Sequence, residues 1–232
     1  MRVYYGWYVV AALFVMLAVA SGLGFYNLSV YMNALVRAHG FPVASVSTAI
    51  ALFFVATGVA GMVAGRMIQR FDVRWTVAFG GLVGGAALAA LGSVHALWQL
   101  YLVYALFGIG HGLASLVPST TLVTRWFAER RSVALSIAST GLSVGGILIT
   151  PASAALIGAV GMGAAAPWLG AAWLLGIVPV TALLLRPWPA AARASGARGA
   201  EPGSEAGGPA PAPETGWRYG AAIRSRFFVA LT

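Results

Sequence analysis

The 232-residue sequence lacks cysteine and lysine altogether and contains only five acidic residues. Without cysteine, these residues can form no disulfide, no thiolate nucleophile and no cysteine-ligated metal site. Charged residues make up 8% of the chain, whereas they make up roughly 25% of an ordinary soluble protein. Hydrophobic residues make up 60%. This composition predicts a protein whose solvent is the lipid bilayer.

The basic residues are all arginine, and they lie between apolar runs instead of along one basic face. Binding to nucleic acid depends on a basic surface that displaces counterions, so we expect no nucleic-acid partner. No Asp or Glu lies within an apolar run. A metal ion or a cationic solute would require a buried carboxylate. The sequence therefore predicts no metal site and no cofactor, and it favours a neutral or anionic solute.

Six apolar stretches are long enough to cross a membrane. A helix needs about 20 apolar residues to cross a hydrocarbon core of about 30 Å, and its peptide groups must be hydrogen-bonded within the segment. The predicted helices are Trp7–Val30, Val46–Ile68, Thr76–Val94, Leu97–Val123, Val133–Val160 and Ala164–Leu185. The short connections include a turn at Gly40-Phe41-Pro42 and a bend at Gly161–Gly163. The predicted fold is an all-α, polytopic bundle of six transmembrane helices over residues 1–186.

The arginines also predict the topology. If the N-terminus is cytoplasmic, all the arginines between 2 and 186 except Arg37 fall at cytoplasmic helix ends, as the positive-inside rule requires. We therefore expect a multi-pass protein of the plasma (inner) membrane of a bacterium. Arg2 and the Ala18-Val19-Ala20 sequence suggest a signal peptide as an alternative. Its removal would leave five helices with their charges on inconsistent sides.

The last part of the chain differs in composition from the helices. Residues 187–216 are rich in Pro, Ala and Gly and predict a flexible cytoplasmic linker. Residues 217–232 combine aromatic and basic residues with an apolar run that stops at Thr232. They predict the start of a truncated seventh helix.

Polar residues follow a pattern that occurs twice. The first and fourth helices are the most polar, the second and fifth are intermediate, and the third and sixth are almost purely apolar. Polar groups in a membrane are costly unless they face the bundle or a wet cavity. The pattern therefore predicts two inverted three-helix repeats, as in many secondary transporters, with the first and fourth helices lining a central cavity.

The segment after the second helix resembles the signature loop of the major facilitator superfamily. Gly65, Arg70, Phe71 and Arg74 match that loop. The sequence departs from it at Gln69, where Asp is usual, and at Asp72, where Gly is usual.

Other segments resemble the oxalate/formate and monocarboxylate-porter branch of the superfamily. These are Tyr5-Gly6-Trp7, Arg125-Trp126-Phe127 and Arg130-Arg131. The resemblance covers roughly Tyr4 to Pro187 and implies the amino-terminal half of a twelve-helix transporter. A carboxy-terminal six-helix half would then be its partner.

The resemblance also implies a cytoplasmic gate. Its residues are Gly65, Arg70, Asp72, Arg74 and Arg131. The alternative is that these arginines only set the topology. Tyr104 stands where proton-coupled members often carry an arginine.

Candidate substrate-binding residues come from the two most polar helices. His111 is the only histidine or acid within a predicted span, and it shares one helix face with Ser115 and Ser119. Asn27 and Tyr31 are also four residues apart on the first helix. We expect the two faces to meet near the bilayer midplane and to bind the substrate. The alternative for His111 is a structural hydrogen bond between helices.

The predicted function is secondary active transport of a small organic anion, such as a mono- or dicarboxylate, by alternating access. The alternative is a non-transporting membrane sensor, or a half-size protein of the same fold that assembles with itself. An intramembrane hydrolase is the third hypothesis, because Gly141-Leu142-Ser143-Val144-Gly145 matches the G-x-S-x-G pattern. That pattern requires a strand-to-helix turn, whereas here it lies in an apolar helical run, where small residues allow close helix packing. We therefore expect no enzyme.

Overall fold

The computed structural model describes residues 5–70, 72–114, 116–126 and 131–184 of the chain. Within these ranges all the secondary-structure elements are helices. The predicted linker (187–216) and the predicted seventh helix (217–232) lie outside the described residues.

The first crossing is one continuous helix of three segments. It consists of α1 (Tyr5–Val19), the π-helical segment η1 (Ala20–Tyr26) and α2 (Leu28–His39). It ends at Gly40, whose φ of 65° is left-handed and whose backbone N–H donates to the Val36 carbonyl (3.1 Å). The crossing is longer than predicted. The apolar run ends near Val30, but one side of α2 remains apolar and buried, and this packing continues the helix.

The next three crossings agree with the prediction to within a few residues. The second is α3 (Val43–Arg70). The third is α4 (Val73–Ala90), which a 3₁₀ turn extends over Leu91–Ser93. The fourth comprises α5 (Leu97–Ala114) and α6 (Leu116–Trp126).

The last two crossings come from α7 (Arg131–Val144), the π-helical segment η3 (Gly145–Ile149) and α8 (Thr150–Leu184). The apolar stretch Arg131–Pro179 is 49 residues long, which would span about 70 Å as one straight helix, more than twice the hydrocarbon core. Gly161 breaks it with φ 79° and ψ 163°, a conformation that glycine adopts without strain. The predicted bend is therefore present, and the five apolar helical stretches among the described residues make six crossings.

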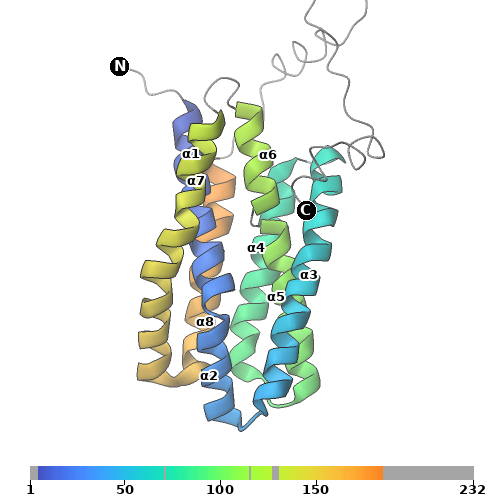
Figure 1. Cartoon of the computed structure of the whole chain (residues 1–232), viewed down its shortest axis with the longest axis vertical. Coiled ribbons are helices and arrows are strands. Elements are labelled where there is room, and N and C mark those ends of the chain that lie inside the picture. The colour runs from blue at the N-terminus through green and yellow to red at the C-terminus, as the bar shows by residue number, and fades with distance from the viewer. Residues whose placement is uncertain (1–4, 71, 115, 127–130, 185–232) are drawn as a thin grey trace, which may run out of the picture. The chain divides into compact units, whose positions relative to one another are not determined.

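The packing pattern shows the predicted repeat. The most extensive contacts join α3 to α5, α4 to α5, α4 to α8 and α1 to α7, as Figure 1 shows. Exchanging the first three crossings with the last three converts the α3–α5 pair into the α1–α7 pair and leaves the α4–α8 pair unchanged. Because each unit has three crossings, the second enters the membrane from the opposite side. The fold is thus an all-α membrane bundle of two inverted repeats.

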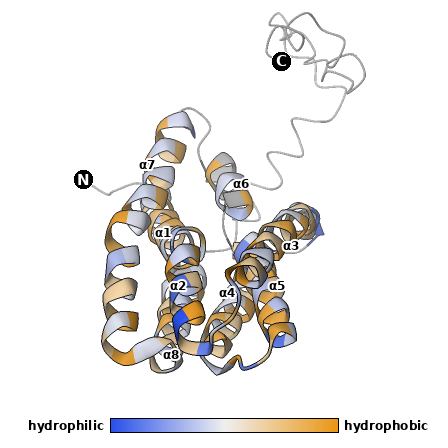
Figure 2. Ribbon diagram, turned by 60° about the horizontal axis from the view of Figure 1, so that its bottom comes forward, coloured by the Kyte–Doolittle hydropathy of each residue, from blue (hydrophilic) through white to orange (hydrophobic). Residues whose placement is uncertain are grey.

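The bundle is held together by close contacts at small residues, and its outside is apolar. A Cβ on Gly110 of α5 would overlap the backbone of Gly84 on α4, so glycine is required for this approach. Large apolar side chains such as Trp75, Trp98 and Trp168 are exposed. Hydrophobic residues occur along all the helices (Figure 2). A surface of this kind is stable in lipid and not in water.

Candidate solute-binding face

Asn27 and Tyr31 of the first crossing form a buried polar cluster with Ser153 of the fifth crossing. Asn27 and Tyr31 are fully buried, and Ser153 on α8 is nearly so. Asn27 Nδ2 donates to Tyr31 Oη (3.1 Å), Tyr31 Oη donates to the Leu23 carbonyl (2.9 Å), and Ser153 Oγ donates to Asn27 Oδ1 (2.8 Å). These groups satisfy one another, as buried polar groups must. Of the predicted substrate residues in this cluster, Asn27 therefore joins the first crossing to the fifth, and Tyr31 holds Asn27 in place from within the first crossing.

The two π-helical segments face each other directly above this cluster. A Cβ on Gly22 of η1 would lie 2.7 Å from the Gly145 carbonyl oxygen of η3. Ser21 Oγ donates to the Leu142 carbonyl (2.8 Å), and Thr150 Oγ1 donates to the Gly22 carbonyl (3.4 Å). A π-helical turn contains one residue more than an α-helical turn and so rotates the side chains that follow it. The segment η1 therefore determines which residues of α2 point toward α8.

The opposite side of the first crossing is open and also polar. We call it the open face and define it as Phe25, Tyr26, Ser29, Asn33 and Arg37, all of which are exposed. Ser29, Asn33 and Arg37 follow one another at intervals of four residues, so they form one stripe along α2. At the π-helical end of the stripe, the Phe25 and Tyr26 rings pack edge to face with centroids 5.2 Å apart.

His111 reaches the first crossing next to the open face. Its ring occupies the space that a side chain at position 24 would need, because a Cβ on Gly24 would lie 2.5 Å from His111 Cδ2. The histidine is half-buried and forms a hydrogen bond with the backbone of Ala20. Its buried Nδ1 atom has no hydrogen-bond partner among the described residues. His111 thus combines a bond between helices with a buried ring nitrogen that no described residue satisfies.

Aromatic rings connect His111 to the open face. The His111 ring lies 5.3 Å from Phe53 and 6.1 Å from Trp173, measured between centroids. Phe53 contacts Phe54 (5.4 Å), which in turn contacts Phe25 (5.9 Å). Three crossings therefore contribute to one aromatic platform beside the histidine. Phe53 and Trp173 are fully buried, whereas Phe25 and Phe54 are about half exposed, so only the last two offer apolar surface on the open side.

The remaining predicted substrate residues are Ser115 and Ser119. Ser119 is buried in α6, and Ser115 lies outside the described residues. The structure therefore groups Asn27 with Tyr31 and Ser153, and it places His111 with Phe53 and Trp173. The sequence analysis did not predict that Tyr26, Ser29, Asn33 and Arg37 lie together on one exposed face. The four-residue spacing of the last three was a signal that could have identified them.

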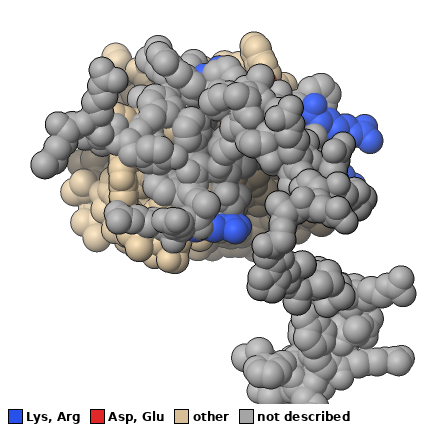
Figure 3. All heavy atoms as spheres, turned by 90° about the horizontal axis from the view of Figure 1, so that it is seen from above, with Lys and Arg blue, Asp and Glu red and all other residues tan. Residues whose placement is uncertain are grey.

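The predicted gate residues lie at the end of the bundle where α1 begins. Arg70 ends α3, Asp72 precedes α4, Arg74 lies in its first turn, and Arg131 begins α7. Gly65 lies in the last turns of α3. The Asp72 carbonyl accepts a hydrogen bond from the Trp75 N–H (3.0 Å), which starts α4. Figure 3 views this end and shows basic side chains on it.

Comparison with known proteins identifies the family. The family model described as "Major Facilitator Superfamily" matches residues 14–232. The chain belongs to the major facilitator superfamily. The relatives in this family are named as transporters, which points to transport rather than enzyme activity.

Individual relatives from bacteria and yeast agree with this membership. The chain is 26% identical over 164 residues to the oxalate:formate antiporter of Oxalobacter formigenes, covering 71% of this chain and 39% of the antiporter. It is 30% identical over 146 residues to the uncharacterized MFS-type transporter YcxA of Bacillus subtilis, covering 60% of this chain and 33% of YcxA. It is 38% identical over 79 residues to the probable transporter MCH2 of Saccharomyces cerevisiae, covering 34% of this chain and 16% of MCH2. The matches thus span well under half the length of these relatives.

Proposed function

We propose that the full-length protein moves a small organic anion, a mono- or dicarboxylate, across the plasma membrane by alternating access. The observation that carries this proposal is the open face of the first crossing, which is polar and contains no acidic residue. Asp72 is the only acidic residue among the described residues, and it lies at the gate end, outside the crossings. A cation would have no carboxylate to bind on this face. The similarity to an oxalate:formate antiporter supports the same solute class.

In this proposal the open face lines the central cavity, and a carboxy-terminal six-helix half completes it. The solute contacts the aromatic platform, Tyr26 and His111 near the middle of the membrane, while Asn27 and Tyr31 support the site from behind by fixing η1 against the fifth crossing. One half rocks against the other to open the cavity to each side in turn. Gly65, Arg70, Asp72, Arg74 and Arg131 form the cytoplasmic gate.

The orientation in the proposal follows from the positive-inside rule. Arg66, Arg70, Arg74 and Arg131 lie at one end of the bundle, whereas Arg37 lies at the other. The end with more arginine faces the cytoplasm. The N-terminus is therefore cytoplasmic, and the plasma membrane in question is the inner membrane of a bacterium.

Uptake of labelled oxalate, formate and lactate into vesicles that contain the full-length protein tests the proposal. Saturable uptake of any of these acids is the expected result, and its response to an imposed pH gradient shows whether protons are coupled. If folded and inserted protein takes up no carboxylate, the solute class is wrong and only the superfamily fold remains.

His111→Ala tests the assigned site within the same assay. Loss of one polar contact to the solute lowers kcat/KM by about tenfold, because 1.4 kcal/mol corresponds to a factor of ten. His95→Ala is the matched control, since His95 is exposed in the connection before α5. Unchanged kinetics of the His111 variant would rule out solute contact by this residue.

A further inference from the structure

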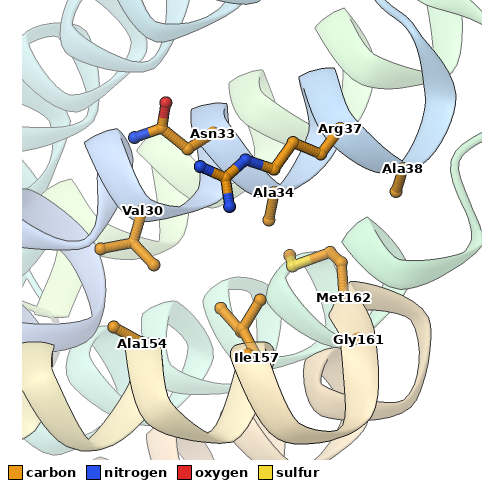
Figure 4. Close-up of a pocket in the computed structure, with 10 residues that line it drawn as sticks. Val30, Asn33, Ala34, Arg37, Ala38, Ala154, Ile157, Gly161 and Met162 are labelled. Atoms are coloured by element: carbon orange, nitrogen blue, oxygen red, sulfur yellow. The ribbon is translucent and has the colours of Figure 1, made fainter.

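A pocket lies between the first and fifth crossings, toward the end of the bundle opposite the gate. Its volume is about 530 Å³, within the range of about 300–1,000 Å³ that is typical of small-molecule sites. Small residues hollow it out, because Ala34 on α2 faces Ala154 and Gly158 on α8. Val30, Ile157 and Met162 provide apolar walls (Figure 4).

Asn33 and Arg37 supply the polar groups of this pocket. They lie four residues apart on α2, and the Arg37 guanidinium extends back along the helix toward Asn33 (Figure 4). A basic residue in the last turn of a helix often interacts with the terminal carbonyl groups. Here the guanidinium points away from that end of α2, and Gly40 caps it by donating to the Val36 carbonyl.

The charge of Arg37 is not neutralised by the part of the chain that the structure describes. Arg37 has no hydrogen-bond or ion-pair partner there, and Asp72 lies at the other end of the bundle. His39 is the ionisable residue nearest to Arg37 in the sequence. Its ring contacts the ring of His95, which lies in the connection before α5 (5.8 Å between centroids). An unpaired cation beside apolar walls produces a positive potential that attracts anions.

We propose that this pocket is an external capture site for the carboxylate group of the transported anion. Arg37 binds the carboxylate through its guanidinium fork, a geometry suited to two parallel hydrogen bonds, and the Asn33 side-chain amide donates a further one. The stripe of Ser29 and Tyr26 then leads from the pocket toward His111. This inference rests on the proposed function for the identity of the anion and for the external position of the pocket.

Transport kinetics measured from each side of the membrane test the capture site. We expect Arg37→Gln in the full-length protein to raise the KM for external carboxylate by about tenfold in intact cells, as loss of a charge-assisted bond predicts. The KM measured from the cytoplasmic side in inverted vesicles should stay within about twofold, since the pocket acts only on entry. Arg37→Lys should restore part of the external affinity, because it keeps the charge and loses the fork.

Arg66→Gln is the matched control for these measurements, because Arg66 is exposed on α3 near the gate end. It should leave the external KM unchanged. An unchanged external KM for Arg37→Gln would overturn the capture site. An equal rise from both sides would also overturn it, since it would place Arg37 at a site common to both orientations.

A labelling experiment tests the pocket independently of transport. Residues 1–232 contain no cysteine, so Ala154→Cys adds the only cysteine to this part of the full-length protein, and any cysteine outside it is replaced by serine. A negatively charged methanethiosulfonate added outside should react faster than a positively charged one, and Arg37→Gln should remove this preference. No reaction from outside, or a preference that is independent of Arg37, would overturn the pocket even if carboxylates are transported. The predicted preference, found in a protein that transports no carboxylate, would instead leave the anion pocket standing and reject the proposed function.

Discussion

The first crossing carries two polar regions whose residues alternate in the sequence. Asn27 and Tyr31 are buried, and they form hydrogen bonds with each other and with the Leu23 carbonyl and Ser153. Tyr26, Ser29 and Asn33 are exposed on the other side of the same helix. The polar groups of the buried residues form their hydrogen bonds within the protein. No hydrogen bond joins the exposed residues to another described helix, and in the proposed function these residues face the solute. The difference shows that polar residues in one transmembrane helix can divide between a buried structural cluster and an exposed face.

The largest loss of stability is expected from a substitution where the buried side of the first crossing packs against the fifth crossing. Gly145→Ala should lower stability by about 3 kcal/mol, the upper part of the usual range for overpacking, because a Cβ there would overlap the Ala18 carbonyl oxygen. A backbone carbonyl in a helix cannot move aside as a flexible side chain can. Thermal unfolding of the full-length protein in detergent measures the change.

Gly58→Ala is the control for this prediction. A Cβ on Gly58 meets nothing within 4 Å among the described residues, so alanine should be neutral or should stabilise α3 by up to about 1 kcal/mol through its helix propensity. Equal unfolding temperatures for the two variants would show that the end of α1 and η3 are not in close contact.

Asparagine substitutions compare the two regions directly. Asn27→Ala should lower stability by about 1–2 kcal/mol, because it removes the buried hydrogen bonds of Asn27 with Tyr31 and with Ser153 on the fifth crossing. Asn33→Ala should leave the unfolding temperature unchanged and raise the KM for external carboxylate severalfold. Both the unfolding temperature and the KM for external carboxylate must be measured for both variants. The proposed difference between the buried and the exposed residues would be wrong if Asn33→Ala destabilised the protein more than Asn27→Ala.

Removal of single tyrosine hydroxyl groups gives the smallest expected effect. Tyr31→Phe removes the bonds to Asn27 and to the Leu23 carbonyl and should cost about 1 kcal/mol of stability with little change in KM. Tyr26→Phe should keep the stability and raise KM about twofold to fivefold, consistent with the loss of a weak polar contact. The reverse result, with KM sensitive to Tyr31 and stability sensitive to Tyr26, would exchange the roles of the two faces.

Much of the fold was predictable from the sequence, because hydrophobic length and arginine position act locally. A helix in lipid must bond its own peptide groups, so runs of about 20 apolar residues predict the crossings without any knowledge of their partners. The turn at Gly40 and the bend at Gly161 were predictable for a similar reason, since both positions have a positive φ that favours glycine. The repeat was visible as an alternation in polarity, and the packing of α3 on α5 and of α1 on α7 confirms it.

The candidate site depended on the tertiary structure. Sequence spacing placed Asn27 and Tyr31 on one helix face but did not determine which way that face points. The π-helical turn of η1 rotates α2, and the contact of η1 with η3 fixes that rotation. The partner of Asn27 is Ser153, 126 residues away. The sequence by itself determined which residues lie in the membrane and which of them are polar. Only the packing of helices distant in sequence decided which of those polar residues are buried against the protein and which remain open to a solute, because a hydrogen-bond partner from another helix leaves no trace in local periodicity.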